Sequence, residues 1–170
     1  MKKIPAIVFG LLLLGVQAGM DAAPTATARL EPRTGSQVQG VVNFVQAGDM
    51  VHVTGEVTGH SKGAKGFHVH EKGDCSDPKA MSAGAHFNPQ GGKHGAPSDP
   101  ARHAGDLGNL MFDDNGVARI DVLVGGISLS KDQPNGIIGR AVIVHLDQDD
   151  LKTDPTGNAG GRAACGVITG

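Results

Sequence analysis

From about residue 28 onward, short runs of alternating apolar and polar residues lie between glycine-rich turns. Alternation with a period of two places successive side chains on opposite faces of a strand, whereas an amphipathic helix needs a period near 3.6. The pattern therefore predicts an all-β domain, because many short strands without convincing helices are typical of a sandwich or barrel. The predicted strands lie near 26–31 and at 37–46, 51–57, 66–70, 107–112, 117–124, 140–146 and 163–168.

Two long stretches, 71–106 and 147–161, interrupt this pattern. Both are rich in Gly, Pro and Asp and carry little apolar periodicity. Connections of this length inside a compact domain are usually functional or disordered. Because the first stretch contains three of the eight histidines, we predict that it is functional.

The N-terminus has the features of an export signal. Lys2 and Lys3 precede an apolar run over 4–16, and Val-Gln-Ala at 16–18 is an acceptable cleavage site. The alternative is a membrane anchor, but the run is short for a span of roughly 20 residues. We therefore expect a signal peptide over 1–18, a flexible segment over 19–27 and one domain over 28–170, with no membrane span after cleavage.

The net charge and the two cysteines indicate which partners and which cellular compartment the sequence favours. The formal net charge is −2, and loss of Lys2 and Lys3 with the signal would make the chain more acidic. The sequence has no basic stripe, so nothing predicts a nucleic-acid partner. Cys75 and Cys165 both lie in the exported part, where an oxidising compartment favours one disulfide. Two buried free thiols are the alternative.

Histidines supply the candidate chemistry. His68 and His70 are two residues apart on a predicted strand, so both rings lie on one face, although such a pair is a weak signal alone. The loop that follows adds His86, His94, His103 and Asp106, a donor set that suits tetrahedral zinc. Solvated loop histidines are the alternative, but six of the eight histidines fall within 60–103.

A ligand count links these residues. His145 ends the apolar run of another predicted strand and brings the set to six histidines and one aspartate. Two four-coordinate ions need eight donors, so seven residues suffice if one imidazole binds both ions through its two nitrogens. His52 lies outside this set, as does His60, and we expect both on the surface.

The chain resembles the copper/zinc superoxide dismutase family, and specifically a secreted, bacterial-type member, over nearly all of its exported part. The matching segments occur in the family's order: 66–71 (GFHVHE), 85–89 (AHFNP), 93–95 (KHG), 102–109 (RHAGDLGN), 157–162 (GNAGGR) and 164–168 (ACGVI). The resemblance implies an eight-stranded antiparallel Greek-key barrel, an immunoglobulin-like sandwich with two long functional loops. It also implies one copper ion and one zinc ion per chain and a periplasmic location.

The same resemblance implies a role for each site residue. Copper would be held by His68, His70, His86 and His145, and zinc by His86, His94, His103 and Asp106, with His86 shared. Asp149 would accept hydrogen bonds from one ligand of each metal, His70 and His94. Arg162 would orient the substrate and His86 would donate a proton. Thr156 would form the channel wall, and Cys75 would pair with Cys165.

The implied activity is disproportionation of superoxide to dioxygen and hydrogen peroxide, which would protect the cell envelope. The resemblance also makes a homodimer possible. A periplasmic copper/zinc buffer without catalysis is the alternative, although a buffer needs no Arg162. One departure concerns the steering charges: Pro155 stands where many eukaryotic members carry a lysine, so Lys93 or Lys152 could supply that charge.

Overall fold

The computed structural model describes residues 23–170, and eight strands account for its regular structure apart from one short 3-10 helix, η1, at Met81–Ala83. The predicted signal peptide lies outside the described residues. The strands are β1 Thr25–Pro32, β2 Gln39–Ala47, β3 Met50–Thr58, β4 Gly63–His70, β5 Asp106–Phe112, β6 Val117–Gly125, β7 Ala141–His145 and β8 Arg162–Val167.

All eight predicted strands are present, each within a few residues of its expected bounds. The sequence predicted a flexible segment over 19–27, but the last residues of this range are ordered. Thr25 to Thr27 already belong to β1, where they pair with Val45 to Asn43 of β2. Backbone pairing with β2 orders these residues, and Ala26 is also buried in the barrel core.

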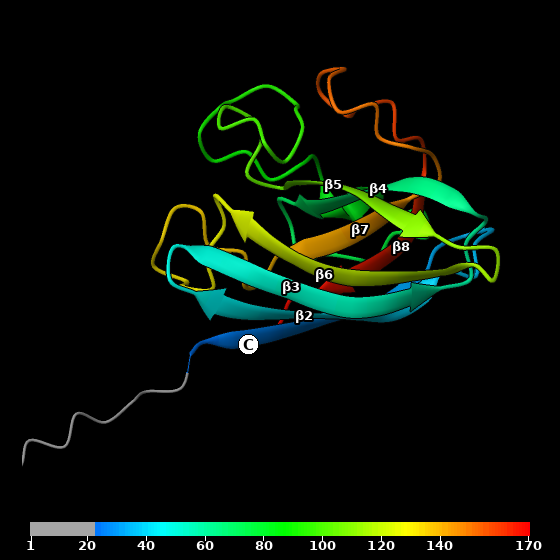
Figure 1. Cartoon of the computed structure of the whole chain (residues 1–170), viewed down its shortest axis with the longest axis horizontal. Coiled ribbons are helices and arrows are strands. Elements are labelled where there is room, and N and C mark those ends of the chain that lie inside the picture. Colours follow the sequence, from blue (N-terminus) through cyan, green and yellow to red (C-terminus); the bar gives the residue numbers. More distant parts are fainter. Residues whose placement is uncertain (1–22) are drawn as a thin grey trace, which may run out of the picture.

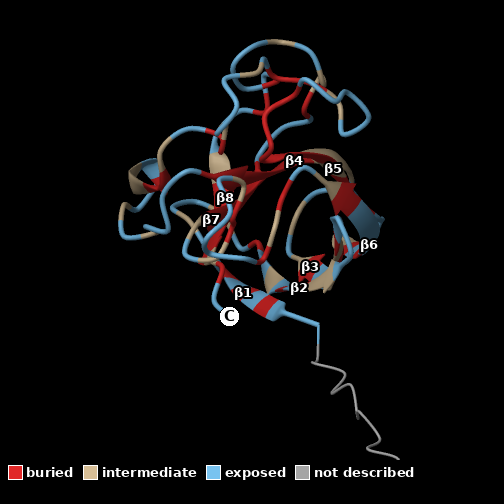
Figure 2. Ribbon diagram, turned by 90° about the vertical axis from the view of Figure 1, so that its left-hand side faces the viewer, coloured by how far each residue is buried: buried red, intermediate tan, exposed pale blue. Residues whose placement is uncertain are grey.

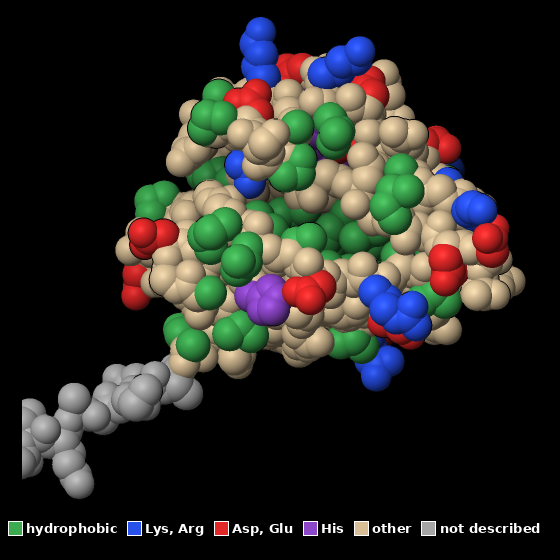
Figure 3. All heavy atoms as spheres, in the orientation of Figure 1, with side chains coloured by type: hydrophobic (Ala, Val, Ile, Leu, Met, Phe, Trp, Pro, Cys, Tyr) green, Lys and Arg blue, Asp and Glu red, His purple; other side chains and the backbone are tan. Residues whose placement is uncertain are grey.

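The strands form one antiparallel sheet in the order β5-β4-β7-β8-β1-β2-β3-β6. This order confirms the Greek-key arrangement, because β4 pairs with β5 and β7 rather than with β3, the strand before it. The sheet curls into a nearly closed barrel whose end strands, β5 and β6, face each other (Figure 1). Figure 3 shows apolar side chains at the bottom of a hollow on this face.

Alternating side chains fill the barrel. In β1, Ala26, Ala28 and Leu30 point inward and are buried, while the residues between them are exposed. Phe44 of β2 is fully buried in the same core. Burial of each large apolar side chain contributes roughly 1.5–3 kcal/mol, so the alternation that predicted the strands also drives the sheet to close.

Strand β7 and residues 66–70 of β4 are buried on both faces, unlike β1 (Figure 2). Val69 and Val142 point into the barrel core. On the outer face, Ile143 packs with Ala80 and Ala83 of the first long loop. The long loops therefore cover one outer wall of the barrel, and in Figure 1 both project from that side.

A disulfide joins the first long loop to this wall. Cys75 lies in the loop and is bonded to Cys165 of β8, 90 residues later in the chain. The expected disulfide is thus confirmed, and the alternative of two free thiols is wrong. Within residues 23–170, no helix has the length and apolar character needed to span a bilayer.

Candidate metal centre

The ligand candidates gather into two groups on the outer face of β4 and β7. Within each group, donor atoms from all four residues lie within 4.8 Å of one another, and all four residues are buried. His86 belongs to both groups. The first group contains His68, His70, His86 and His145, and the second contains His86, His94, His103 and Asp106.

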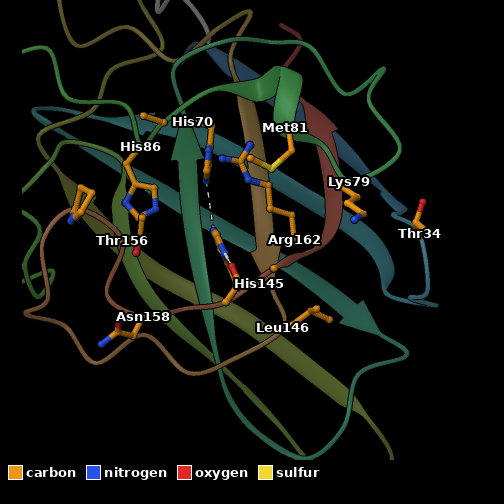
Figure 4. Close-up of a pocket in the computed structure, with 14 residues that line it drawn as sticks. Thr34, His70, Lys79, Met81, His86, His145, Leu146, Thr156, Asn158 and Arg162 are labelled. Atoms are coloured by element: carbon orange, nitrogen blue, oxygen red, sulfur yellow. Dashed lines mark hydrogen bonds between the residues drawn. The ribbon is translucent and has the colours of Figure 1, made fainter.

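Strand pairing brings the first group together. His68 and His70 lie on β4, and His145 ends the neighbouring strand β7. His86 comes from the first long loop, whose backbone bridges His70. The Nε2 atoms of His70 and His145 lie 3.4 Å apart and face each other (Figure 4), and the rings of His68 and His86 have centroids 4.1 Å apart.

In each of these strand histidines, one ring nitrogen is held by the protein. Nε2 of His68 donates to Asp149 (2.7 Å), Nδ1 of His70 donates to the carbonyl of Gly84 (2.9 Å), and Nδ1 of His145 donates to the carbonyl of Gly160 (3.3 Å). These bonds select the tautomer and leave the second nitrogen of each ring with a free lone pair. Nδ1 of His68 has no hydrogen-bond partner although it is buried.

Asp106 organises the second group. Its Oδ1 lies 2.8 Å from Nδ1 of His86, 3.1 Å from Nδ1 of His94 and 3.4 Å from Nδ1 of His103. Burial alone would raise the pKa of Asp106, but the hydrogen bond from His86 and the close approach of the His94 ring outweigh it and hold the pKa below its usual range. The carboxylate is therefore ionised, as a metal ligand must be.

Unpartnered nitrogen atoms test whether the site fits metal ions. The buried side-chain nitrogens without a hydrogen bond among residues 23–170 are Nδ1 of His68, His94 and His103 and Nε2 of His86. An orphaned buried polar atom costs free energy unless something binds it. All four atoms belong to the two groups, so the donor sets fit two cations.

Protonation states favour metal binding at the first group. Burial, together with the nearby His145 and His86, holds the pKa of His70 well below its usual range. Burial likewise lowers the pKa of His68 to about 4, although its hydrogen bond to Asp149 opposes the shift. The rings are therefore neutral at pH 7, the form that coordinates metals.

Asp149 connects the two groups, but not through the expected pair. Its Oδ2 accepts from Nε2 of His68 (2.7 Å) and its Oδ1 from Nε2 of His94 (2.9 Å). The predicted hydrogen bond between Asp149 and His94 is confirmed, whereas the one predicted with His70 is wrong. Because β7 is antiparallel to β4, the chain leaving β7 lies beside the start of β4, near His68, and Nδ1 of His70 is already held by Gly84.

Three further residues position Asp149 and the second group. Asn109 of β5 holds the backbone of Asp149 through two hydrogen bonds, of 2.8 and 2.9 Å. Gly157 has a φ of +63°, and a Cβ there would overlap the Asp149 carboxylate and the His94 ring. Asp154 accepts from the backbone N–H of His94 (2.8 Å). Asn109 and Gly157 lie in the family-like segments, but their roles are visible only in the fold.

Arg162 lies across the strand pair from His145, at the start of β8. Its guanidinium donates to the carbonyl oxygens of Ala80 (2.6 Å) and Gly84 (2.5 Å). Since Gly84 also accepts from His70, one carbonyl links the guanidinium to a ring of the first group. Both carbonyls belong to the loop that the disulfide holds. The two hydrogen bonds fix the orientation of the planar guanidinium.

A cavity of about 710 Å³ opens onto the first group (Figure 4). His70, His86, His145 and Arg162 reach it, and Thr156 forms part of its wall. The second group is more enclosed, since of its members only His86 lines the cavity. A small anion can therefore approach the first group beside a fixed positive charge.

Comparison with known proteins decides the family. The family model for copper/zinc superoxide dismutase (SODC) matches residues 38–168. The chain belongs to the copper/zinc superoxide dismutase family. It is 49% identical over 138 residues to superoxide dismutase [Cu-Zn] 2 of Brassica juncea, covering 77% of this chain and 89% of that protein. The crystal structure of the clock protein EA4 matches with a TM-score of 0.79 and 49% identity, covering 89% of this chain and 97% of that one.

Membership in this family makes the protein a copper- and zinc-dependent superoxide dismutase, and the two histidine groups are consistent with these cofactors. For the dismutase cavity, the sequence suggested Lys93 or Lys152 as a steering charge. The lysine among the lining residues is instead Lys79, in the first long loop. The disulfide-bonded loop folds back over β8, which brings a residue distant in sequence to the cavity rim.

Proposed function

We propose that His86 binds both metal ions of this dismutase at once. Its Nδ1 faces Asp106 in the second group, and its Nε2 is buried without a hydrogen-bond partner in the first. A ring with one nitrogen in each group is the observation that carries the proposal, because it completes two four-residue donor sets from seven residues. In this assignment copper would take the first group, which is open to the cavity, and zinc the enclosed second group.

This placement matches the different roles expected of the two ions, structural for zinc and catalytic for copper. A closed set of three imidazoles and one carboxylate is typical of a structural zinc site, whereas a catalytic ion needs access for substrate. Bound copper supplies one-electron chemistry, oxidising one superoxide to dioxygen and reducing the next to hydrogen peroxide. Nε2 of His86 has no protein partner and lies at the cavity wall, so it would hold a proton whenever it is not bound to the metal.

Arg162 would attract and orient superoxide. Two of its N–H groups are held by backbone carbonyls, so the guanidinium is fixed at the cavity wall without a carboxylate to neutralise it within hydrogen-bonding distance. Lys79 adds a second positive charge at the rim. In an acidic chain, these two residues would create the local field that a small anion needs.

The enzyme would act outside the cytoplasm and protect the cell envelope from superoxide. Lys2, Lys3 and the apolar run over 4–16 support export to the periplasm. The Cys75–Cys165 disulfide supports the same location, since such bonds persist in oxidising compartments.

A prediction about the shared ring tests the proposal. Protein loaded with Cu²⁺ in the first group and Co²⁺ in the second should show magnetic coupling between the ions, because an imidazolate that bridges them transmits it. The measurement is the temperature dependence of the magnetic susceptibility, with the Co²⁺-only protein as reference. Independent paramagnetism of the two ions would contradict a bridging His86.

A prediction about Arg162 separates the enzyme from a metal buffer. Arg162→Ala should retain both metals, because arginine is not a ligand, yet lose about tenfold or more in the superoxide consumption rate. Positive charges at a cleft raise on-rates for anions by roughly 10- to 1,000-fold. Pulse radiolysis over a range of salt concentrations is the measurement, and the variant should show the flatter salt dependence because less charge remains to be screened.

Lys152→Ala is the matched control for this variant. It removes the same charge from an exposed position in the second long loop that does not line the cavity. Its rate should stay close to that of the unmodified protein. Equal rates for the Arg162 and Lys152 variants, with full metal content, would leave Arg162 without a role in substrate capture.

A further inference from the structure

Met81 is a cavity residue that the dismutase reaction does not use. It begins η1 in the first long loop and is 62% exposed. Its side chain lines the same cavity as His70, His145 and Arg162 (Figure 4). A thioether is the most readily oxidised side chain after a thiol, so this position brings an oxidisable sulfur to the space in which product is released.

The backbone around Met81 is held in place. The preceding residue, Ala80, has a left-handed conformation with φ of 56°, and its carbonyl accepts from Arg162 (2.6 Å). The N–H of Met81 itself donates to the carboxylate of Asp77 (3.0 Å). These two contacts fix the backbone at Ala80 and Met81, so Met81 does not lie at the tip of a free loop.

We propose that Met81 is a site at which the enzyme is oxidised by its own product, hydrogen peroxide. A lone pair of the Met81 sulfur attacks one peroxide oxygen, so that an S–O bond forms as the O–O bond breaks. The second oxygen leaves as water after the protons redistribute, and the net change is thioether plus hydrogen peroxide to sulfoxide plus water. Sulfur loses two electrons and the peroxide gains them, so no other reactant is needed.

Exposure alone does not single out this methionine. Met111 of β5 is 68% exposed and Met50 of β3 is 38% exposed, and neither lines the cavity. The distinction is the source of the oxidant, since peroxide formed in the cavity meets Met81 before it is diluted. Oxidation makes the side chain polar, and in the cavity that Arg162 also lines the sulfoxide oxygen would compete with superoxide for the guanidinium.

The inference rests on the proposed placement of the catalytic ion at the cavity. The test uses copper- and zinc-loaded enzyme that consumes repeated additions of superoxide, with catalase present to remove peroxide from bulk solution. Peptide mass spectrometry then measures sulfoxide at each methionine. We expect several-fold more sulfoxide at Met81 than at Met111, while equal or lower oxidation of Met81 in an active sample overturns the inference.

Zinc-only protein treated with added hydrogen peroxide provides the comparison without turnover. There, oxidation of Met81 and Met111 should be similar, following their exposure, and an equally strong preference for Met81 would also overturn the inference. Superoxide consumption is followed in every copper- and zinc-loaded sample, so loss of the dismutase reaction itself would be seen separately. After the same turnover, Met81→Leu should retain a larger fraction of its initial rate of superoxide consumption than Met111→Leu. Equal losses of rate would contradict the proposed competition between the sulfoxide and superoxide for Arg162.

Discussion

Replacing Asp149 with alanine is expected to weaken binding of both metal ions, by roughly 10- to 100-fold each, the range found when a carboxylate that orients a metal-bound histidine is removed. The two oxygens of Asp149 accept from His68 in one group and from His94 in the other. Without them, both rings lose the hydrogen bond that selects their tautomer. The measurement is competition with chelators of known affinity, made separately for copper and for zinc.

Two further variants sharpen this prediction. Asp149→Asn keeps the size of the side chain but has one oxygen acceptor, so it should impair one group more than the other. Asp150→Ala is the control, because that carboxylate binds Thr153 and Asn158 within its own loop and no ligand ring. Unchanged affinity for either metal in Asp149→Ala would show that the ring hydrogen bonds do not orient the ligands.

The second large effect is expected on stability, when Cys75 and Cys165 are both replaced by alanine. The disulfide closes a loop across 90 residues, and removal of such a bond typically costs about 2–5 kcal/mol. Alanine suits the site, since Cys165 is 1% exposed in an apolar cluster with Ala83 and Ile143. Urea denaturation of the metal-loaded proteins measures the difference in the free energy of unfolding.

The same double variant should lose activity as well as stability. The loop that carries Cys75 also contains Ala80 and Gly84, whose carbonyls hold Arg162. Arg33 anchors this loop independently through the carbonyl of Cys75 (2.6 Å), so part of its structure should persist. The unmodified protein, with its disulfide intact, should carry no free thiol when denatured. An unchanged unfolding midpoint in the double variant would refute a stabilising role for the disulfide.

Much of the fold could be predicted because its cause is local. In β1, alternate burial of Ala26, Ala28 and Leu30 follows directly from the alternation of residue types. The start of β1 was harder to predict, because Thr25 and Thr27 are exposed and are ordered by backbone pairing with β2. Lys79 was missed as a cavity residue for a similar reason: a lysine in a loop gives no local signal of the surface it will face.

The sequence by itself determined the residue types of the centre: the pair His68 and His70 on one strand face, and seven donor residues, which suffice for two four-coordinate ions if one ring is shared. Only the tertiary structure decided which nitrogen of each ring is free and which histidine Asp149 holds. These properties depend on antiparallel pairing between β4 and β7 and on loops folded across them, contacts between residues about 80 positions apart. Hydrogen-bond direction at such contacts is set by packing in space, and residue order alone does not encode it.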